Sequence, residues 1–121
     1  ASGGFTKALG DQARGVVVTQ VFPSERSLNY PVIKEAMGLA KAKGIDELTP
    51  AMVEGFINAK VLVEGLRRAS PKPDRARMLA AMEGMRKFDL GGLELSYSAT
   101  DHSGLAFTDL SIVGSDGRFK R

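Results

Sequence analysis

The stretch Val16-Val17-Val18-Thr19-Gln20-Val21-Phe22 decides what kind of sheet this chain needs. Most of its residues are apolar or β-branched, so side chains on both faces of an extended strand are hydrophobic. A strand of this kind suits a sheet that is covered on both sides, which is typically a parallel sheet. Pro23 ends the strand because proline has no backbone N–H to donate to a neighbouring strand. We therefore predict a strand over 16–22 with neighbouring strands and covering layers.

A short helix precedes this strand and a longer one follows it. Residues 3–10 have the character of the last turns of a helix, with Gly10 in the left-handed position that closes it. Pro31 fits the first position of a helix that runs to about Lys43. That helix carries an apolar stripe at helical spacing: Ile33, Ala36, Met37 and Ala40.

Residues 50–69 form the strongest helical pattern in the chain. Thr49 is expected to cap this helix, with proline in its first position. Its apolar residues cover two neighbouring faces: Met52, Phe56, Ala59, Val63 and Leu66 on one, and Val53, Ile57 and Val61 on the other. An apolar arc this wide predicts contact on two sides. Lys60, Glu64 and Arg68 follow at spacing four along the polar edge, which predicts a ladder of ion pairs.

A third helix is expected from Asp74, as its cap, to about Met85, with a buried stripe of Met78, Leu79, Met82 and Met85. The hydrophobic period then changes from helical to alternating. Residues 93–97 predict a half-buried strand, 105–113 a second strand and 118–120 a short third one. The expected fold class is α/β, with helices followed by a small antiparallel meander.

The predicted strands and helices do not supply all the neighbours that their apolar surfaces need. The strand over 16–22 needs parallel neighbours, and no second strand follows until residue 93. The helix over 50–69 also offers more apolar surface than two short helices cover. The missing surfaces therefore come either from chain outside this sequence or from a second copy.

Composition excludes several classes of protein. The 121 residues suffice for one domain, and 43% hydrophobic with 26% charged residues is typical of globular proteins. The absence of cysteine rules out disulfides, cysteine-ligated metals and cysteine nucleophiles. No uncharged apolar run approaches the roughly 18 residues that span a bilayer. The chain begins at Ala1, so we expect it to be processed from a longer protein or to be part of one.

The formal net charge of +3 is modest, and the basic residues are spread along the chain. The densest basic segment, over 67–77, is interrupted by two prolines and Asp74. We interpret it as solvated surface and expect no nucleic-acid partner.

No catalytic or metal-binding constellation stands out. Asp101, His102 and Ser103 have the residue types of a hydrolase triad, but neighbours in one turn cannot converge on a reacting atom. Gly3-Gly4 at a helix start could receive a ligand carboxylate, or they are simply a helix start. We expect no enzyme, no cofactor and no metal.

The order of several segments resembles a known family. Ala8-Leu9-Gly10-Asp11-Gln12-Ala13-Arg14-Gly15 leads into the valine-rich strand and then a proline. Matching segments follow in order: Tyr30–Glu35, Met52–Ala69, Arg77–Glu83, Phe88–Tyr97, Asp101–Gly104 and Gly114–Phe119. Together they resemble the type I periplasmic binding proteins of ABC importers, in the leucine/isoleucine/valine-binding group.

The resemblance implies a C-terminal portion of a longer protein with two α/β lobes that close on a small ligand. Residues 1–21 and 109–121 would belong to the second lobe, and 24–106 to the first. Val21, Pro23 and Thr108 would lie at hinge crossings between the lobes, where closure rotates the backbone.

The family holds an amino acid largely through residues upstream of this portion. Second-lobe contacts include a side chain just before the short helix, which makes Ser2 and Gly3 candidates for ligand binding. No acidic residue stands there, so the usual partner of the ligand ammonium does not carry over. Gln20 and Phe22 are further candidates for the cleft, with ordinary sheet and hinge packing as the alternative.

The implied function is that of a non-enzymatic periplasmic solute-binding protein for ABC-type uptake of branched-chain or related amino acids or small carboxylates. Its partners would be that ligand and the transporter permease, and the isolated portion is expected to self-associate. The alternative is a small stand-alone module that dimerises through the helix over 50–69 and binds an acidic partner.

Overall fold

The fold was analysed in a computed structural model, which describes residues 2–121. Its helices are α1 (Ser2–Leu9), the 3-10 helix η1 (Gly10–Ala13), α2 (Pro31–Ala42), α3 (Pro50–Ala69) and α4 (Arg75–Glu83). Its strands are β1 (Val17–Gln20), β2 (Phe88–Asp89), β3 (Glu94–Leu95), β4 (Asp109–Val113) and β5 (Phe119–Lys120). Mixed helices and small antiparallel sheets confirm the predicted α/β content.

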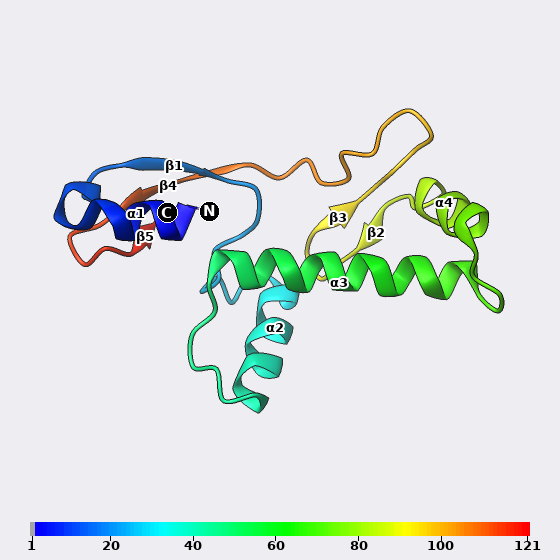
Figure 1. The fold of residues 1–121 in the computed structure, drawn as a ribbon, viewed down its shortest axis with the longest axis horizontal. Coiled ribbons are helices and arrows are strands. Elements are labelled where there is room, and N and C mark those ends of the chain that lie inside the picture. Colours follow the sequence, from blue (N-terminus) through cyan, green and yellow to red (C-terminus); the bar gives the residue numbers. More distant parts are fainter. Residues whose placement is uncertain (1) are drawn as a thin grey trace.

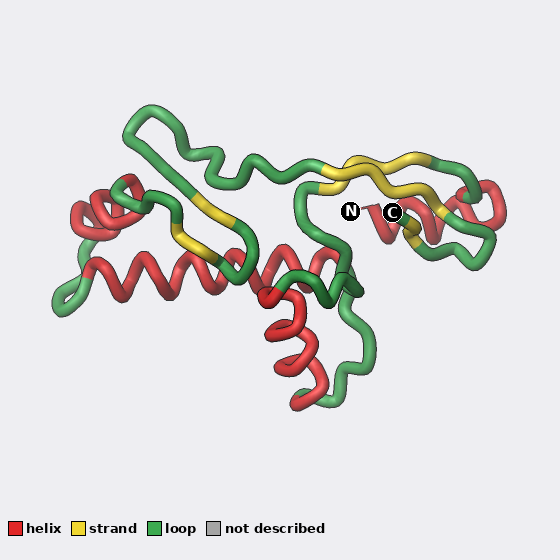
Figure 2. The backbone as a smooth tube through the Cα atoms, turned by 180° about the vertical axis from the view of Figure 1, so that it is seen from behind, coloured by secondary structure: helices red, strands yellow, loops and turns green. Residues whose placement is uncertain are grey.

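The elements form two groups at the two ends of an elongated molecule (Figure 1). A three-stranded sheet with the order β1-β4-β5 lies at one end, with α1 beside it. The hairpin β2-β3 lies along α3 in the other group, and α4 occupies the far end (Figure 2). The chain crosses between the groups twice, after β1 and before β4.

The sheet around β1 is antiparallel, so the prediction of a parallel sheet covered on both sides is wrong. Val17 of β1 pairs with Ile112 of β4, and Gln20 pairs with Asp109. Val17 is 60% exposed and Val21 56% exposed. The strand is also shorter than predicted, because the chain turns toward α2 after Gln20. Within the described residues, β4 is the only strand that pairs with β1, which leaves the outer edge of β1 and the face that carries Val17 uncovered.

The hydrophobic core lies in the second group. The described part of this core consists of Val32, Ile33, Val53, Ile57, Val61, Met85, Leu90, Leu93 and Leu95. The turn between β2 and β3 approaches α2 closely, and the N–H of Val32 donates to the carbonyl of Gly91 at 3.0 Å. Helix α2 begins at Pro31 and α3 at Pro50, as predicted.

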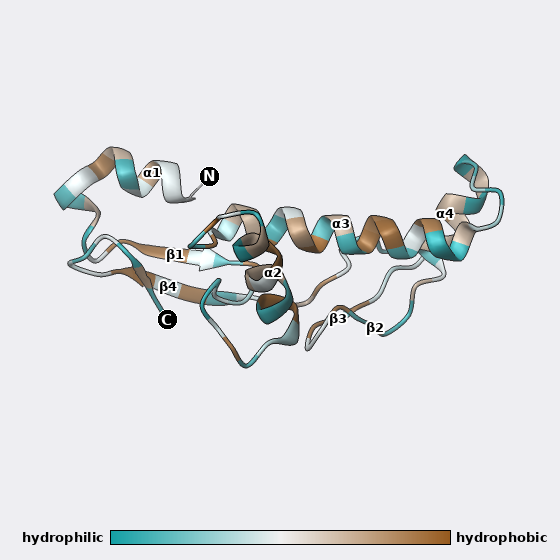
Figure 3. Cartoon of the chain, turned by 90° about the horizontal axis from the view of Figure 1, so that it is seen from below, coloured by the Kyte–Doolittle hydropathy of each residue, from teal (hydrophilic) through white to brown (hydrophobic). Residues whose placement is uncertain are grey.

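Helix α3 packs with only one of its two apolar faces. Val53, Ile57 and Val61 are buried, whereas Met52, Leu62, Val63 and Leu66 are between 41% and 64% exposed. The wide apolar arc is therefore real, but only half of it has a partner within the described chain. Figure 3 shows apolar segments along the length of this helix. The predicted ion-pair ladder forms only in part: Glu64 pairs with Arg68, but Lys60 pairs with Glu35 of α2.

Helix α4 differs from its prediction in length and burial. It ends at Glu83, and none of its residues is buried. Leu79 is 54% exposed, and Met78 and Met82 are half-buried against Gly65 of α3. Met85 is fully buried but follows the helix. The stripe stays half open because, among the described elements, α3 is the main one against which α4 packs.

The strands after α4 pair differently from the predicted meander. Residues 94–95 pair with 88–89, a strand that the sequence pattern did not indicate. The segment over 105–113 is a strand only from Asp109, and it pairs with β1. Its first part departs from the strand because Leu105 and Phe107 pack against the core of the second group. The short return at β5 is confirmed.

Candidate functional site

A cavity of about 470 Å³ lies where the two groups of elements meet. The first group contributes α1, β1 and the C-terminus to its wall, and the second contributes the start of α3. Its lining residues are Gly3, Gly4, Thr19, Gln20, Val21, Phe22, Pro23, Thr49, Pro50, Ala51, Glu54 and Arg121. Three of the four residues predicted to bind ligand therefore line one cavity, namely Gly3, Gln20 and Phe22.

Gln20 is the best-positioned polar side chain in this cavity. It is the last residue of β1 and is only 7% exposed. Its Nε2 donates to Oγ of Ser111 on β4 at 2.9 Å, and that hydroxyl donates to the carbonyl of Val18 at 3.2 Å. This chain of bonds fixes the amide, and a fixed amide presents its remaining hydrogen-bonding capacity in a defined direction.

Two charged residues of the cavity carried no sequence signal. Arg121 lies at the C-terminal end of the described chain, and its side chain is 13% exposed. Its Nη1 donates to the carbonyl of Phe22 at 2.8 Å and lies 3.5 Å from Oδ2 of Asp109. Glu54 is exposed on the first turns of α3. A guanidinium suits a ligand carboxylate and a carboxylate suits a ligand ammonium, so the cavity offers both signs of charge.

The beginning of α3 faces the same cavity. Oγ1 of Thr49 accepts the N–H of Met52 at 3.2 Å, which confirms the predicted cap. Pro50 occupies the first helical position. The positive end of the helix dipole therefore points toward the cavity and favours an anionic group there.

The remaining predicted residues have different surroundings. Pro23 is buried at the cavity wall, Val21 is largely exposed beside it, and Phe22 is half-buried. Thr108 is exposed and is not part of the wall. Ser2 begins α1, but its side chain lies outside the described residues.

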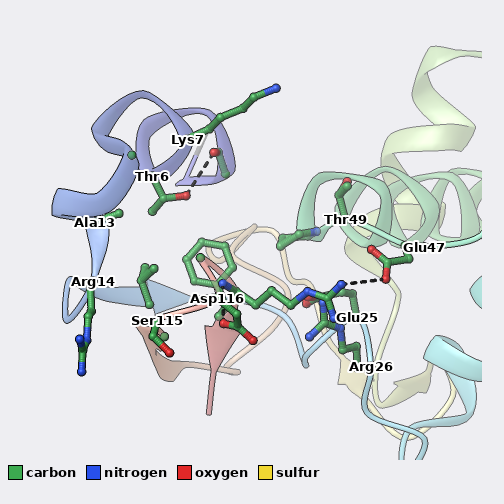
Figure 4. A pocket seen from close by; sticks show the side chains of 18 of the residues that line it. Thr6, Lys7, Ala13, Arg14, Glu25, Arg26, Glu47, Thr49, Ser115 and Asp116 are labelled. Atoms are coloured by element: carbon green, nitrogen blue, oxygen red, sulfur yellow. Dashed lines mark hydrogen bonds and ion pairs between the residues drawn. The ribbon is translucent and has the colours of Figure 1, made fainter.

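A larger cavity of about 790 Å³ adjoins the first one and shares Gly3, Thr49 and Pro50 with it (Figure 4). Charged side chains of both signs line it, and Nη2 of Arg118 lies 3.4 Å from Oε1 of Glu47 across the two groups. The side chains of Lys7 and Arg14 point away from its centre. Oε2 of Glu25 is buried without a hydrogen-bond partner among the described residues. We place the site in the smaller cavity, because Gln20 and the crossing after β1 meet there.

The Asp101-His102-Ser103 turn is not arranged as a triad. Nε2 of His102 lies 3.1 Å from Oε1 of Glu83, whereas the Asp101 carboxylate accepts the hydroxyl of Ser103 at 2.6 Å. The hydroxyl and N–H of Ser103 lower the pKa of Asp101 from its ordinary value. Among residues 2–121, no three metal-ligating side chains cluster closely enough to share an ion. In the same range, no helix combines the length and hydrophobicity of a membrane span.

The family follows from a comparison of the sequence with known families. The family described as "Periplasmic binding protein" matches residues 3–117. The chain belongs to this family. Its members are named for the periplasm, and membership implies a periplasmic or extracellular location. No curated protein matches the chain significantly.

Solved structures of the family share the fold of this chain. A substrate-binding periplasmic protein from Ralstonia solanacearum aligns with a TM-score of 0.81 and 34% identity, over 97% of this chain and 34% of its own. A possible leucine/isoleucine/valine-binding protein from Rhodopirellula baltica SH 1 aligns with a TM-score of 0.78 and 28% identity, over 96% of this chain and 32% of its own.

A branched-chain amino acid ABC transporter protein from Thermus thermophilus, solved with bound valine, shares the fold at 21% identity and a TM-score of 0.76. It is covered over 35% of its length by 98% of this chain. The chain thus spans about a third of the length of each of these proteins. The resemblance to type I periplasmic binding proteins is confirmed.

Proposed function

We propose that this chain is the C-terminal third of a periplasmic solute-binding protein that serves an ABC importer and has no catalytic activity. In this proposal residues 1–21 and 109–121 belong to one lobe and 24–106 to the other. The separation of the β1-β4-β5 group from the α2-α3-α4 group supports this division. The two crossings between the groups, at 21–23 and near Thr108, would then be hinge segments.

The ligand we propose is a branched-chain or related amino acid, or a small carboxylate. The observation that carries this proposal is the cavity at the junction of the two groups, with Gln20 fixed in its wall. Arg121 and the start of α3 would attract a ligand carboxylate, and Glu54 an ammonium group. Gly3 leaves room close to the backbone of α1, since no atom lies within 4 Å of where a Cβ would be. The likeness to the possible leucine/isoleucine/valine-binding protein of Rhodopirellula baltica supports the ligand class.

Ligand binding would act by closing the lobes. A ligand that contacts both walls of the cavity binds the closed form better, and this differential affinity shifts the equilibrium toward closure. The closed form would then be the one that the permease of the importer recognises. Within the described chain, the backbone connects the two walls at the two crossings, and the exposed pair of Arg118 and Glu47 is a side-chain contact that closure could rearrange.

The test is calorimetric titration of the full-length protein with valine, leucine and small carboxylates. Replacing Gln20 by Ala is expected to weaken binding about fivefold, because one buried hydrogen bond is worth roughly 1 kcal/mol. Gln12→Ala is the matched control, since Gln12 is exposed and does not line the cavity. Unchanged affinity in the Gln20 variant would remove the site from this cavity. If none of these ligands binds, the proposed ligand class is refuted.

We also propose that the 121-residue chain self-associates when it is separated from the rest of the protein. The exposed apolar face of α3 and the unpaired edge of β1 support this proposal. The same surface keeps open the alternative of a stand-alone module that dimerises through α3. The full-length gene product distinguishes the two: a long segment before Ala1 favours the solute-binding protein.

A further inference from the structure

The positive charge of this chain gathers at one end of the molecule. Residues 67–87 hold seven Lys and Arg side chains and two acidic ones, a net charge of +5. Because the whole chain carries +3, the remaining residues carry −2. These seven residues lie at the end of α3, in the turn to α4, and on or just after α4. We call this surface the basic end: Arg67, Arg68, Lys72, Arg75, Arg77, Arg86 and Lys87.

The basic end is solvent-facing, and the acidic side chains within it are already engaged. Arg67 is 71% exposed as a side chain and Arg68 32%, and all seven residues of the basic end are exposed. Oδ1 of Asp74 accepts the N–H of Arg77 at 2.8 Å as the cap of α4. Oε1 of Glu83 faces His102 at 3.1 Å. Neither carboxylate therefore lies free to neutralise the surrounding cations. Glu64 of α3 already pairs with Arg67 and Arg68. Among the described residues, the other five cations of the basic end form no ion pair with a carboxylate.

The geometry points to a docking surface for an acidic protein partner at the basic end. Five of its seven cations are arginines. The planar guanidinium group of arginine can form two parallel hydrogen bonds with the two oxygens of one carboxylate. Two of these arginines are held in place by main-chain contacts, with Nη1 of Arg77 donating to the carbonyl of Lys72 and Nη1 of Arg86 to that of Glu83. Leu79 is the large apolar side chain exposed on α4, and it supplies an anchor among these charges.

Charge also disfavours covering this surface with further apolar chain. The uncovered apolar face of α3 favours burial by additional chain, whereas the five cations without a carboxylate partner among the described residues would lose their hydration against an apolar surface. The basic end lies at the far end of α3, away from the β1-β4-β5 sheet (Figures 1 and 2). It is thus also remote from the proposed ligand cavity, and this inference does not rest on solute binding.

An acidic protein surface fits the basic end better than a lipid surface. Helices that lie in a membrane interface present a broad apolar face opposite their charges. Helix α4 instead turns Met78 and Met82 toward Gly65 of α3 and leaves Leu79 as its large exposed apolar residue. One leucine gives little insertion into a bilayer, whereas it suffices as an apolar contact within a charged protein interface.

The test compares two triple variants of the full-length protein with the same change in net charge. The first is Lys72→Gln, Arg75→Gln and Arg77→Gln at the basic end. The control is Lys34→Gln, Lys41→Gln and Lys43→Gln, which removes three exposed charges on or next to α2. Fluorescence titration with poly-L-glutamate at low salt measures binding, and circular dichroism checks that both variants are folded.

We expect the first variant to bind poly-L-glutamate about tenfold or more weakly than the unaltered protein, and the control to change little. Binding should also weaken as salt is raised, because exposed charges are screened. Equal weakening in the two variants would mean that only net charge matters and would overturn the proposal. Vesicles of phosphatidylglycerol and phosphatidylcholine form the second arm. Binding to these vesicles without binding to poly-L-glutamate would overturn the choice of partner.

Discussion

Glu64 shows how a sequence pattern and its structural outcome differ at a single residue. Its carboxylate accepts Nε and Nη2 of Arg67 at 2.9 and 2.7 Å and Nε of Arg68 at 2.7 Å, and the residue is 8% exposed. The hydrogen bonds from Arg67 and then Arg68 lower the pKa of Glu64 from 4.5 to about 2. Spacing along the helix predicted Arg68 but not Arg67. The spacing also did not predict that Lys60 would pair with Glu35 of α2 and not with Glu64.

A pH dependence of stability follows from Glu64. Since its pKa is lower in the folded chain, its contribution is present above about pH 4.5 and is lost as pH falls toward 2. Glu64→Gln should lower the free energy of unfolding by about 1 kcal/mol at pH 7, with exposed Arg67 limiting the effect. Urea denaturation at pH 7 and near pH 2 measures it, with Glu54→Gln as the control. The difference should shrink to a small fraction near pH 2, and an equal loss at both pH values would assign the effect to packing.

Gly91 is a position where the backbone admits no side chain. Its φ is +112°, and a Cβ there would lie 2.7 Å from the backbone N of Val32. Gly91→Ala should therefore lower the free energy of unfolding by roughly 2 kcal/mol or more, from both strain and the clash with α2. Gly38→Ala on α2 is the control, because its Cβ meets no atom within 4 Å and alanine favours helices by about 0.5–1 kcal/mol. Thermal unfolding that ranks the two variants in the opposite order would contradict this.

At the scale of elements, helix starts were predictable and sheet partners were not. The caps at Thr49 and Asp74 are local, since each side chain bonds an N–H three residues ahead. Strand pairing is non-local: β1 pairs with β4, about 90 residues away, and β2 was missed because two residues give no periodic signal. The same limit applies to the site. Gln20 was marked by the hinge position that the family resemblance implies, whereas Arg121 and Glu54 reach the cavity only through the fold.

The cap of α3 gives a prediction at this scale. Thr49→Ala removes the acceptor of the Met52 N–H and should lower the free energy of unfolding by about 1 kcal/mol. Thr49→Ser keeps the hydroxyl and should retain most of that stability. Urea denaturation of both variants provides the comparison. A Ser variant as unstable as the Ala variant would mean that the threonine methyl group, and not the cap, stabilises this end of α3.

For the whole molecule, the uncovered surfaces agree with the finding that the chain covers about a third of each solved relative. Its strand β1 has one neighbour in the described chain, and α3 presents Leu62, Val63 and Leu66 to solvent. A free strand edge and an exposed apolar helix face are both surfaces that pair with other chains. Composition alone had suggested an ordinary small domain. The distribution of burial indicates instead a piece whose remaining contacts lie elsewhere.

The last prediction concerns this chain on its own. The isolated 121-residue chain should associate at micromolar concentration, and Val63→Lys with Leu66→Lys should shift it toward the monomer by placing charge on the outer face of α3. Leu28→Lys with Leu39→Lys is the matched control, because both leucines are 55% exposed but lie on other segments. Light scattering gives the mass of the particle, and hydrogen exchange reports whether the β1 amides gain protection on association. A monomer with well-protected β1 amides would show that these surfaces need no partner, and equal effects of the two variants would move the contact away from α3.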